Sequence, residues 1–176
     1  MIRFPAPARA RAGGLSVPDL MLAAAVLVGL LTASFYLSRR EPDRVADHAT
    51  VIDGDTLRVD GAPIRLLGLD APELHQTCTM GDRPYPCGEE ARRGLVRLVA
   101  AGPLACEVRG HDRYGRRLAR CVVAGRDLGA VLVENGLAVS YGGYAAEEAE
   151  ARRNRAGLWG GAFQRPSEWR KEHPRS

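Results

Sequence analysis

Apolar and polar residues are distributed very differently in the first forty residues and in the rest of the chain. Residues 20–37 read LMLAAAVLVGLLTASFYL and contain no charge. A helix of this length covers roughly 27 Å, close to the thickness of the hydrocarbon core of a bilayer. A helix buried in a soluble core would carry a polar face, which this segment lacks. The pattern predicts one transmembrane helix at 20–37, between a basic tail at 1–19 and a charged linker at 38–47.

A cleavable signal peptide is the alternative interpretation of residues 20–37. The apolar region of a signal peptide is usually about 7–15 residues long and ends at a small-x-small site. The segment here is longer and is followed by Arg39-Arg40, so an uncleaved anchor is favoured. Arginines flank both ends of the segment, so the positive-inside rule does not decide its orientation.

Short alternating segments beyond residue 48 predict a β-rich domain over 48–172. Apolar residues at strand spacing, broken by turn residues, predict strands at 50–59, 63–69, 104–108 and 117–124. A long polar loop is expected between residue 74 and residue 88. Helical spacing and capping residues predict helices at 89–100, after Asp127, and at 145–156. No strand–helix–strand rhythm repeats, so we expect an α+β fold, a small closed barrel with packed helices.

Four cysteines lie in the predicted domain without a CxxC or His/Cys cluster, a pattern that disfavours a zinc site. Three pairings are possible. If the second hairpin turns on Arg113-Tyr114, positions that sum to 227 face each other, and Cys106 faces Cys121. The remaining pair, Cys78 and Cys87, would close a short loop. Disulfides need an oxidising space, so we expect the domain in the periplasm or outside, secreted if the N-terminal segment is cleaved. Buried free thiols in a cytosolic protein are the alternative.

The overall charge is compatible with a polyanionic partner but does not require one. The formal net charge is +4, and 24 of the 25 basic residues are arginine, because only Lys171 is lysine. A GC-rich genome would produce this bias without any function. The arginines that matter must therefore be identified by their positions.

Three short clusters carry candidate chemistry: Asp53-Gly54-Asp55-Thr56, then Arg65 with Asp70-Ala71-Pro72-Glu73, then Asp112-Arg113-Tyr114-Gly115-Arg116. Carboxylates buried together repel one another, and a hard cation such as Ca²⁺ would relieve that repulsion. Arginines can hold phosphate oxygens in a two-pronged contact. Together these groups suit phosphodiester cleavage. Taken singly, each cluster is also typical of a turn, a surface cation or a loop at a strand end.

The order of the motifs resembles the staphylococcal-nuclease (thermonuclease) family. The matching segments, spread over about 48–159, are VIDGDT, RLLGLDAPE, DRYGR, ENGLA and GLW. The resemblance implies a five-stranded OB-fold barrel with three helices, and a Ca²⁺-dependent nuclease that acts on DNA and RNA with little sequence specificity. We expect single-stranded substrates to be preferred, and we predict no protein partner.

The resemblance also implies roles for individual residues. Asp55 and Asp70 would bind calcium through side chains and Ala71 through its carbonyl. Glu73 would be the general base, and Arg65 and Arg116 the catalytic phosphate-binding pair. Arg113 and Tyr114 would hold the terminal phosphate of a bound nucleotide. Ala71 departs from the family's reference enzyme, which has threonine there.

A non-catalytic OB-fold module that binds single-stranded nucleic acid or a protein partner is the alternative function. Loss of Glu73 or of either catalytic arginine would be its signature, and all three are present.

Overall fold

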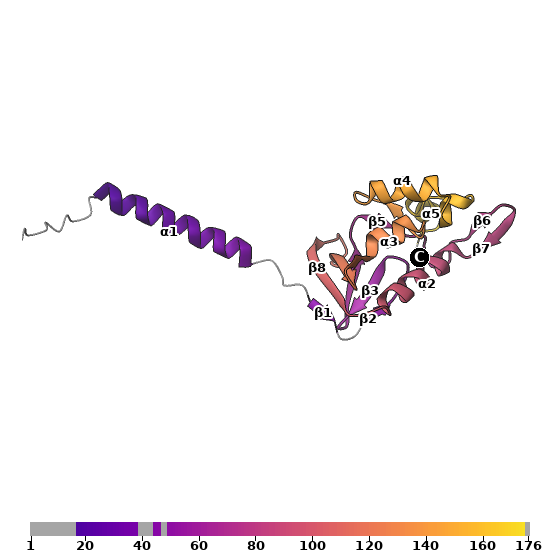
Figure 1. Cartoon of the computed structure of the whole chain (residues 1–176), viewed down its shortest axis with the longest axis horizontal. Helices are drawn as coiled ribbons and strands as arrows, with labels where there is room; N and C mark the ends of the chain where they lie inside the picture. Colours follow the sequence, from indigo (N-terminus) through magenta and orange to yellow (C-terminus); the bar gives the residue numbers. More distant parts are fainter. Residues whose placement is uncertain (1–16, 39–43, 47–48, 175–176) are drawn as a thin grey trace, which may run out of the picture. The chain divides into compact units, whose positions relative to one another are not determined.

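A computed structural model describes residues 17–38, 44–46 and 49–174 (Figure 1). It divides into two units, Met1–Arg40 and Glu41–Ser176. Most of the predicted basic tail, part of the predicted linker, and His48, where the domain was expected to begin, lie outside the described residues.

The first unit contains one helix, α1 (Val17–Ser38), which includes the predicted apolar segment. Pro18 is well suited to the first helical turn. The negative charge of Asp19 stabilises the helix because it lies at the positive, N-terminal end of the helix dipole. Residues Val17–Ser34 form a stretch long and apolar enough to cross a membrane, and all of it is exposed. An N-terminal signal sequence meets the same criterion, so anchor and signal both remain predictions.

The second unit is built on a mixed sheet. Its strands follow the order β1-β8-β9-β4-β3-β2, with β10 paired to β9. Their bounds are β1 Arg44–Ala46, β2 Ala49–Val51, β3 Thr56–Val59, β4 Ala62–Leu66, β8 Leu104–His111, β9 Arg117–Val123 and β10 Arg126–Asp127. The pair β4–β9 is parallel, and the other pairs are antiparallel. The mixed α+β class is as expected. The closed five-stranded barrel is not confirmed, because β1 and β2 are the two ends of the described strand order.

The β8–β9 hairpin carries the first predicted disulfide. Cys106 faces Cys121 in the ladder, and the two are bonded with their Cα atoms 4.1 Å apart. A bulge between Val108 and Gly110 shifts the register by one residue before the turn. The turn therefore runs from Asp112 to Arg116 and does not centre on Arg113-Tyr114. The predicted cysteine pairing is still correct, because the extra residue at the bulge offsets the different turn and restores the expected register at Cys106 and Cys121.

Residues 74–88 contain a hairpin instead of the predicted polar loop. Strands β6 (Cys78–Met80) and β7 (Arg83–Tyr85) pair across a two-residue turn at Gly81, whose φ of 59° suits glycine. The disulfide Cys78–Cys87 joins this hairpin to the next helix. Both predicted disulfides are thus present, and no described cysteine is free. Sequence spacing missed the hairpin because each strand is only three residues long and Pro84 interrupts the second, so no alternating pattern is visible.

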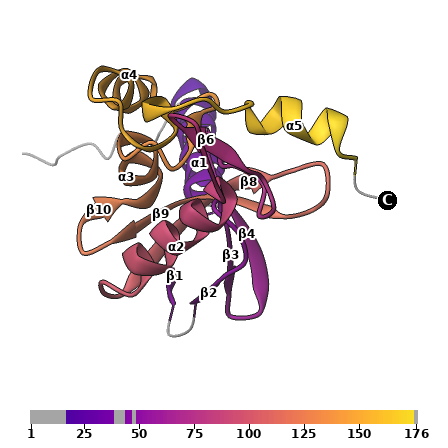
Figure 2. The ribbon, with the colours of Figure 1, turned by 90° about the vertical axis from the view of Figure 1, so that its right-hand side faces the viewer.

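Helices cover the sheet and close the core. They are α2 (Cys87–Val99), α3 (Leu128–Glu134), α4 (Ala145–Arg153), the 3₁₀ helix η1 (Gly157–Gly160) and α5 (Pro166–Glu172). The first three were predicted, and Asp127 caps α3 by accepting a hydrogen bond from the Ala130 N–H at 3.0 Å. The α-helix α5 was not predicted, so the described domain has more than the three expected helices. Figure 2 shows α5 lying apart from α3 and α4.

Large aliphatic side chains from the sheet and from α2 and α3 form the main core. The most deeply buried are Leu57, Leu69, Leu95, Leu128 and Leu132. A two-residue pair between β5 (Leu69–Asp70) and β11 (Val139–Ser140) extends from this core. Because Leu69 is packed inside, Asp70 and the residues after it are held at a fixed point beside the sheet.

Glu148 fixes α4 to the segment before it and to the C-terminal segment. Its carboxylate accepts hydrogen bonds from the Ser140 N–H at 2.6 Å and from Arg152, and it pairs with Arg165 at 3.5 Å. Burial tends to raise the pKa of Glu148, but these contacts outweigh it and lower the pKa below its usual value. The carboxylate therefore stabilises the fold when it is ionised.

We expect Glu148→Gln to reduce the free energy of unfolding by about 2 kcal/mol at pH 7. A carboxyl whose folded pKa is depressed stabilises the fold above its unfolded pKa, and that contribution is lost as the pH falls through the folded pKa. The difference between wild type and variant should therefore shrink at pH 3, as measured by urea unfolding. Glu147→Gln on the same helix is the control. An equal difference at both pH values would contradict this role of the charge.

Candidate active site

Asp55 is a buried carboxylate placed by an irregular turn just before β3. Only 3% of the residue is exposed. Its own N–H donates to Asp53 Oδ1 at 3.0 Å, which shapes the turn. Its carboxylate accepts from Thr56 Oγ1 at 2.9 Å and from the Ala71 N–H at 3.1 Å. Two of the predicted metal ligands, Asp55 and Ala71, are therefore brought into direct contact from separate segments.

Arg65 on β4 joins the two buried carboxylates. It lies opposite Thr56 in the β3–β4 ladder. One terminal nitrogen donates to Asp55 Oδ1 at 2.8 Å, and the other donates to Asp70 Oδ1 at 2.8 Å. Asp70 is only 2% exposed. The planar guanidinium thus fixes the spacing of two carboxylates that would otherwise repel each other.

Arg170 on α5 adds a second guanidinium, and the sequence analysis did not identify it. Its Nη2 donates to Asp70 Oδ2 at 2.9 Å, and its Nη1 donates to Asp70 Oδ1 and Glu73 Oε1, both at 3.0 Å. Partial burial alone would lower the pKa of Arg170, but the hydrogen bonds to Asp70 and Glu73 raise it above its usual value. Pro166 at the start of α5 was a helix-start signal, but nothing in the local sequence pointed to the distant carboxylates.

The acidic and basic groups form an alternating chain, Asp55–Arg65–Asp70–Arg170–Glu73. Three carboxylates face two guanidiniums, so one negative charge is left over. Burial raises the pKa of the Asp55 carboxyl to about 7; Arg65 opposes this, while Asp53 and Asp70 add to it. Additional positive charge near Asp55 would therefore be favourable.

The carboxylate oxygens of this site are of the kind that bind a hard cation, but in this structure they accept hydrogen bonds from Arg65 and Arg170. Within the described residues, no three His, Cys, Asp or Glu side chains form a group that could hold a metal on their own. The Asp55 and Asp70 carboxylates share one guanidinium, and the Ala71 main chain adjoins Asp55. These are oxygen donors of the type that Ca²⁺ prefers. The residues present therefore fit calcium in type, with the guanidiniums lying among the carboxylates.

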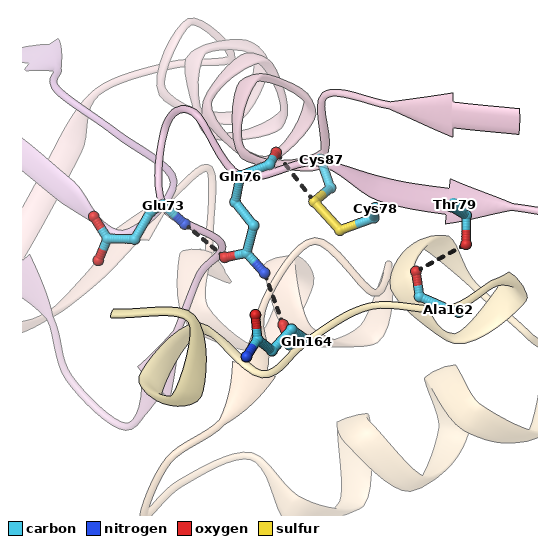
Figure 3. Close-up of a disulfide and its surroundings, with 7 residues drawn as sticks. All are labelled: Glu73, Gln76, Cys78, Thr79, Cys87, Ala162 and Gln164. Atoms are coloured by element: carbon cyan, nitrogen blue, oxygen red, sulfur yellow. Dashed lines mark hydrogen bonds between the residues drawn. A yellow bond between two sulfur atoms is a disulfide. The ribbon is translucent and has the colours of Figure 1, made fainter. Parts of the chain in front are cut away.

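The loop that carries Glu73 is fixed by the buried Gln76 (Figure 3). The Glu73 N–H donates to Gln76 Oε1 at 3.2 Å, and the Gln76 N–H donates to the Glu73 carbonyl at 2.7 Å. At Gly88 an added Cβ would lie 1.8 Å from the Glu73 carbonyl oxygen, so α2 can approach this loop only with glycine there. In Figure 3 the Glu73 carboxylate points away from Gln76, so the amide orients the main chain only.

The third cluster lies in the β8–β9 turn. Asp112 accepts from Arg116 Nε at 2.7 Å and from the main-chain N–H groups of Tyr114 and Arg116. Burial acts in the opposite direction, but these bonds lower the pKa of Asp112. The Arg113 guanidinium lies 4.8 Å from the centre of the exposed Tyr114 ring. Among the described residues, no hydrogen bond or ion pair joins this cluster to Asp55 or Asp70.

Strand register places the start of β9, which follows Arg116, beside the strand that carries Arg65. Leu118 on β9 lies opposite Arg65 in the parallel β4–β9 pair. Arg116 comes two residues before Leu118, as the last residue of the turn that leads into β9. Arg116 therefore directly precedes the strand that pairs with β4, which carries Arg65.

Comparisons with known proteins identify the family to which the chain belongs. A protein-family model described as "Staphylococcal nuclease homologue" matches residues 63–161. The chain is 37% identical to the succinoglycan biosynthesis protein ExoI of Rhizobium meliloti (strain 1021), over 88% of the chain and 82% of that protein. It is 36% identical to the staphylococcal-like nuclease CAN1 of Arabidopsis thaliana, over 61% of the chain and 33% of that protein. It is 30% identical to the micrococcal nuclease of Shigella flexneri, over 69% of the chain and 77% of that protein.

The chain therefore belongs to the family of staphylococcal nuclease homologues, because the matched region covers more than half of its 176 residues. That region includes Arg65, Asp70, Glu73 and Arg116. Asp55 and Arg170 lie outside it, on its two sides. The chain spans about a third of the plant nuclease, but most of ExoI and of the Shigella nuclease.

Proposed function

We propose that this protein is a calcium-dependent nuclease that hydrolyses phosphodiester bonds in DNA and RNA with little sequence specificity. The observation that carries the proposal is the alternating chain of three carboxylates and two guanidiniums, built around the buried Asp55 and Asp70. Burying this many charged groups costs desolvation free energy and adds little to stability. Such clusters are therefore typical of functional sites. Relatives that bear the name nuclease support the same conclusion.

Asp55, Asp70 and the Ala71 carbonyl would hold Ca²⁺. When bound, the ion supplies a Lewis acid that polarises the phosphoryl group and offsets charge that develops on it. Alanine at position 71 keeps the main-chain carbonyl, which is the donor that this ligand role requires.

Glu73 would act as the general base that takes the proton from the attacking water. Its main chain is held by Gln76, so its carboxylate starts from a fixed point beside Asp70. Arg65 and Arg116 would donate hydrogen bonds to the phosphate oxygens as negative charge grows there. Arg116 is suited to this because Asp112 engages its Nε, and no other described residue accepts a hydrogen bond from its terminal nitrogens.

Arg113 and Tyr114 would bind the substrate beyond the cleaved bond. Arg113 can contact a terminal phosphate, and the exposed ring of Tyr114 offers a stacking surface. Such contacts reach phosphates and base faces but not base edges, which supports low sequence specificity. They also favour single strands, because bases in a single strand are open to stacking.

We propose that the domain works in an oxidising space, in the periplasm or outside the cell, attached to the membrane through α1 or released if that segment is cleaved. The two disulfides support this location, because they persist outside reducing compartments.

The test of the function is cleavage by the full chain, purified in detergent, of end-labelled single-stranded DNA and RNA. Fragments should accumulate with Ca²⁺ and should be absent with a calcium chelator, and calcium added back in excess should restore them. Binding without cleavage in Ca²⁺ would defeat the proposal and identify a non-catalytic binding module instead. Cleavage that continues in the chelator would defeat the calcium dependence alone.

A further inference from the structure

Arg170 occupies the carboxylate oxygens that a calcium ion would need. Its two terminal nitrogens contact both oxygens of Asp70 and one oxygen of Glu73, at 2.9–3.0 Å. An ion that coordinates Asp70 must approach those same oxygens to about 2.3–2.6 Å. Arg65 and Arg170 together fill three of the about four acceptor positions of the Asp70 carboxylate. The positive charge of Arg170 also repels a divalent cation placed beside it, so the ion and the Arg170 contacts exclude each other.

The chain brings Arg170 to this position through a segment that is anchored twice. Thr79 on β6 and Ala162 exchange main-chain hydrogen bonds at 2.9 and 3.0 Å. Two residues later, the Gln164 carbonyl accepts from Gln76 Nε2 at 2.7 Å (Figure 3). Gln76 also holds the Glu73 main chain, so the same side chain positions both the Glu73 loop and the segment that leads into α5.

The anchoring stops short of Arg170 itself. Pro166, at the start of α5, is buried, whereas the Arg170 side chain is 36% exposed. Lys171 and Glu172, which follow it, are exposed. The guanidinium can therefore leave Asp70 toward solvent without disturbing the packed core.

We infer that Arg170 is an intramolecular cation that competes with calcium for Asp70, and that calcium binding displaces it from Asp70 and Glu73. The protein must give up the Arg170 contacts before it binds the ion, so its apparent calcium affinity is the intrinsic affinity multiplied by the fraction of molecules in which Arg170 is detached. Arg170 thus sets the calcium concentration at which the site fills. The inference depends on the proposed calcium site. It goes beyond that proposal because it makes Arg170, a residue outside the region 63–161 that matches the family model, control the calcium affinity of the site.

Isothermal calorimetry of Ca²⁺ binding to the full chain in detergent tests this without relying on activity. Arg170→Gln should tighten the calcium Kd by about tenfold or more. Arg170→Lys, which keeps the charge but cannot contact both carboxylates in the same way, should fall between wild type and Arg170→Gln. Lys171→Gln removes a neighbouring positive charge and should leave the Kd within about twofold of wild type, as expected of an exposed charge in screening salt.

Two further variants separate the possible failures. Asp70→Asn should abolish calcium binding both in the wild-type background and with Arg170→Gln. If calcium binds in an Asp70-dependent way but Arg170→Gln leaves the Kd unchanged or weakens it, Arg170 is not a competitor and the inference is overturned, while the calcium site stands. If no variant binds calcium, the proposed metal site fails and the inference fails with it.

Displacement has its own signal, because Trp169 is the neighbour of Arg170 on α5 and stacks on His173. In a Trp159→Phe background, Trp169 is the remaining tryptophan. Calcium should change its fluorescence in the protein that has Arg170 and should change it much less in Arg170→Gln. An equal response in both would contradict displacement. Circular dichroism of each variant verifies that it is folded.

Discussion

Replacing Glu73 with glutamine is expected to lower kcat on single-stranded DNA by about 10²–10⁴-fold in saturating Ca²⁺, the usual contribution of a positioned general base. The glutamine amide has the same size but cannot take a proton from water. The Glu73 main chain is held by Gln76 and by the close approach of Gly88, so the loop should keep its shape. KM should change far less than kcat, because the phosphate contacts come from other residues. Steady-state kinetics with end-labelled substrate measures both constants.

Glu89→Gln is the matched control for this experiment. Glu89 is a carboxylate at the start of α2 that pairs with Arg92 at 3.8 Å in an exposed position, so its loss should leave kcat unaltered. Unchanged kcat in Glu73→Gln would remove Glu73 from the role of base. A loss that appears mainly in KM would assign it to substrate binding.

Arg116→Lys is expected to reduce kcat/KM by about 10²–10³-fold, the cost of removing one well-placed donor to a developing oxyanion. Lysine keeps the positive charge but presents a single ammonium group, which cannot hold two phosphate oxygens while it also bonds Asp112. The Arg116 side chain is 27% exposed, so the substitution should not disturb the core. Kinetics with and without added salt will show whether charge alone substitutes for the planar group.

Arg109→Lys in the same hairpin is its control. Arg109 is exposed and pairs with Glu107, at a position outside the proposed site. It should retain full activity and the same melting temperature. Activity equal to wild type in Arg116→Lys would contradict a two-pronged phosphate contact and would reduce the role of Arg116 to general electrostatics.

The two arginines that contact Asp70 are held differently, which bears on how the site works. Arg65 lies within a strand, and its side chain is 19% exposed, whereas Arg170 reaches Asp70 from a seven-residue helix and is 36% exposed. Arg65 is therefore suited to keep its contacts during a reaction, and Arg170 is suited to leave Asp70 for solvent. If Arg170 moves away as calcium arrives, Arg65 remains to orient both carboxylates around the ion.

The motifs that the sequence determined are local. Asp55, Arg65, Asp70 and Glu73 lie within nineteen consecutive positions, and a strand, a turn and the returning strand bring them together with little help from the rest of the chain. The pairing of Cys106 with Cys121 was equally local, because a hairpin ladder fixes opposite partners by counting. An unbroken apolar run located α1, apolar residues at helical spacing located α2, and the capping residue Asp127 located α3.

Only the tertiary structure decided the features that depend on distant segments. The parallel pairing of β4 with β9, which brings the turn residue Arg116 close to the strand of Arg65, leaves no local signal, because four strands and a helix separate the two strands in the chain. Arg170 lies 100 positions from Asp70, on a helix too short to show an apolar stripe, and it reaches the site through anchors at Thr79 and Gln76. Local spacing reports which face of an element is apolar, whereas contacts between elements depend on how the whole core packs. The sequence therefore determined which acidic and basic residues gather around Asp55 and Asp70 from neighbouring segments, and only the fold showed that Arg170 also contacts Asp70.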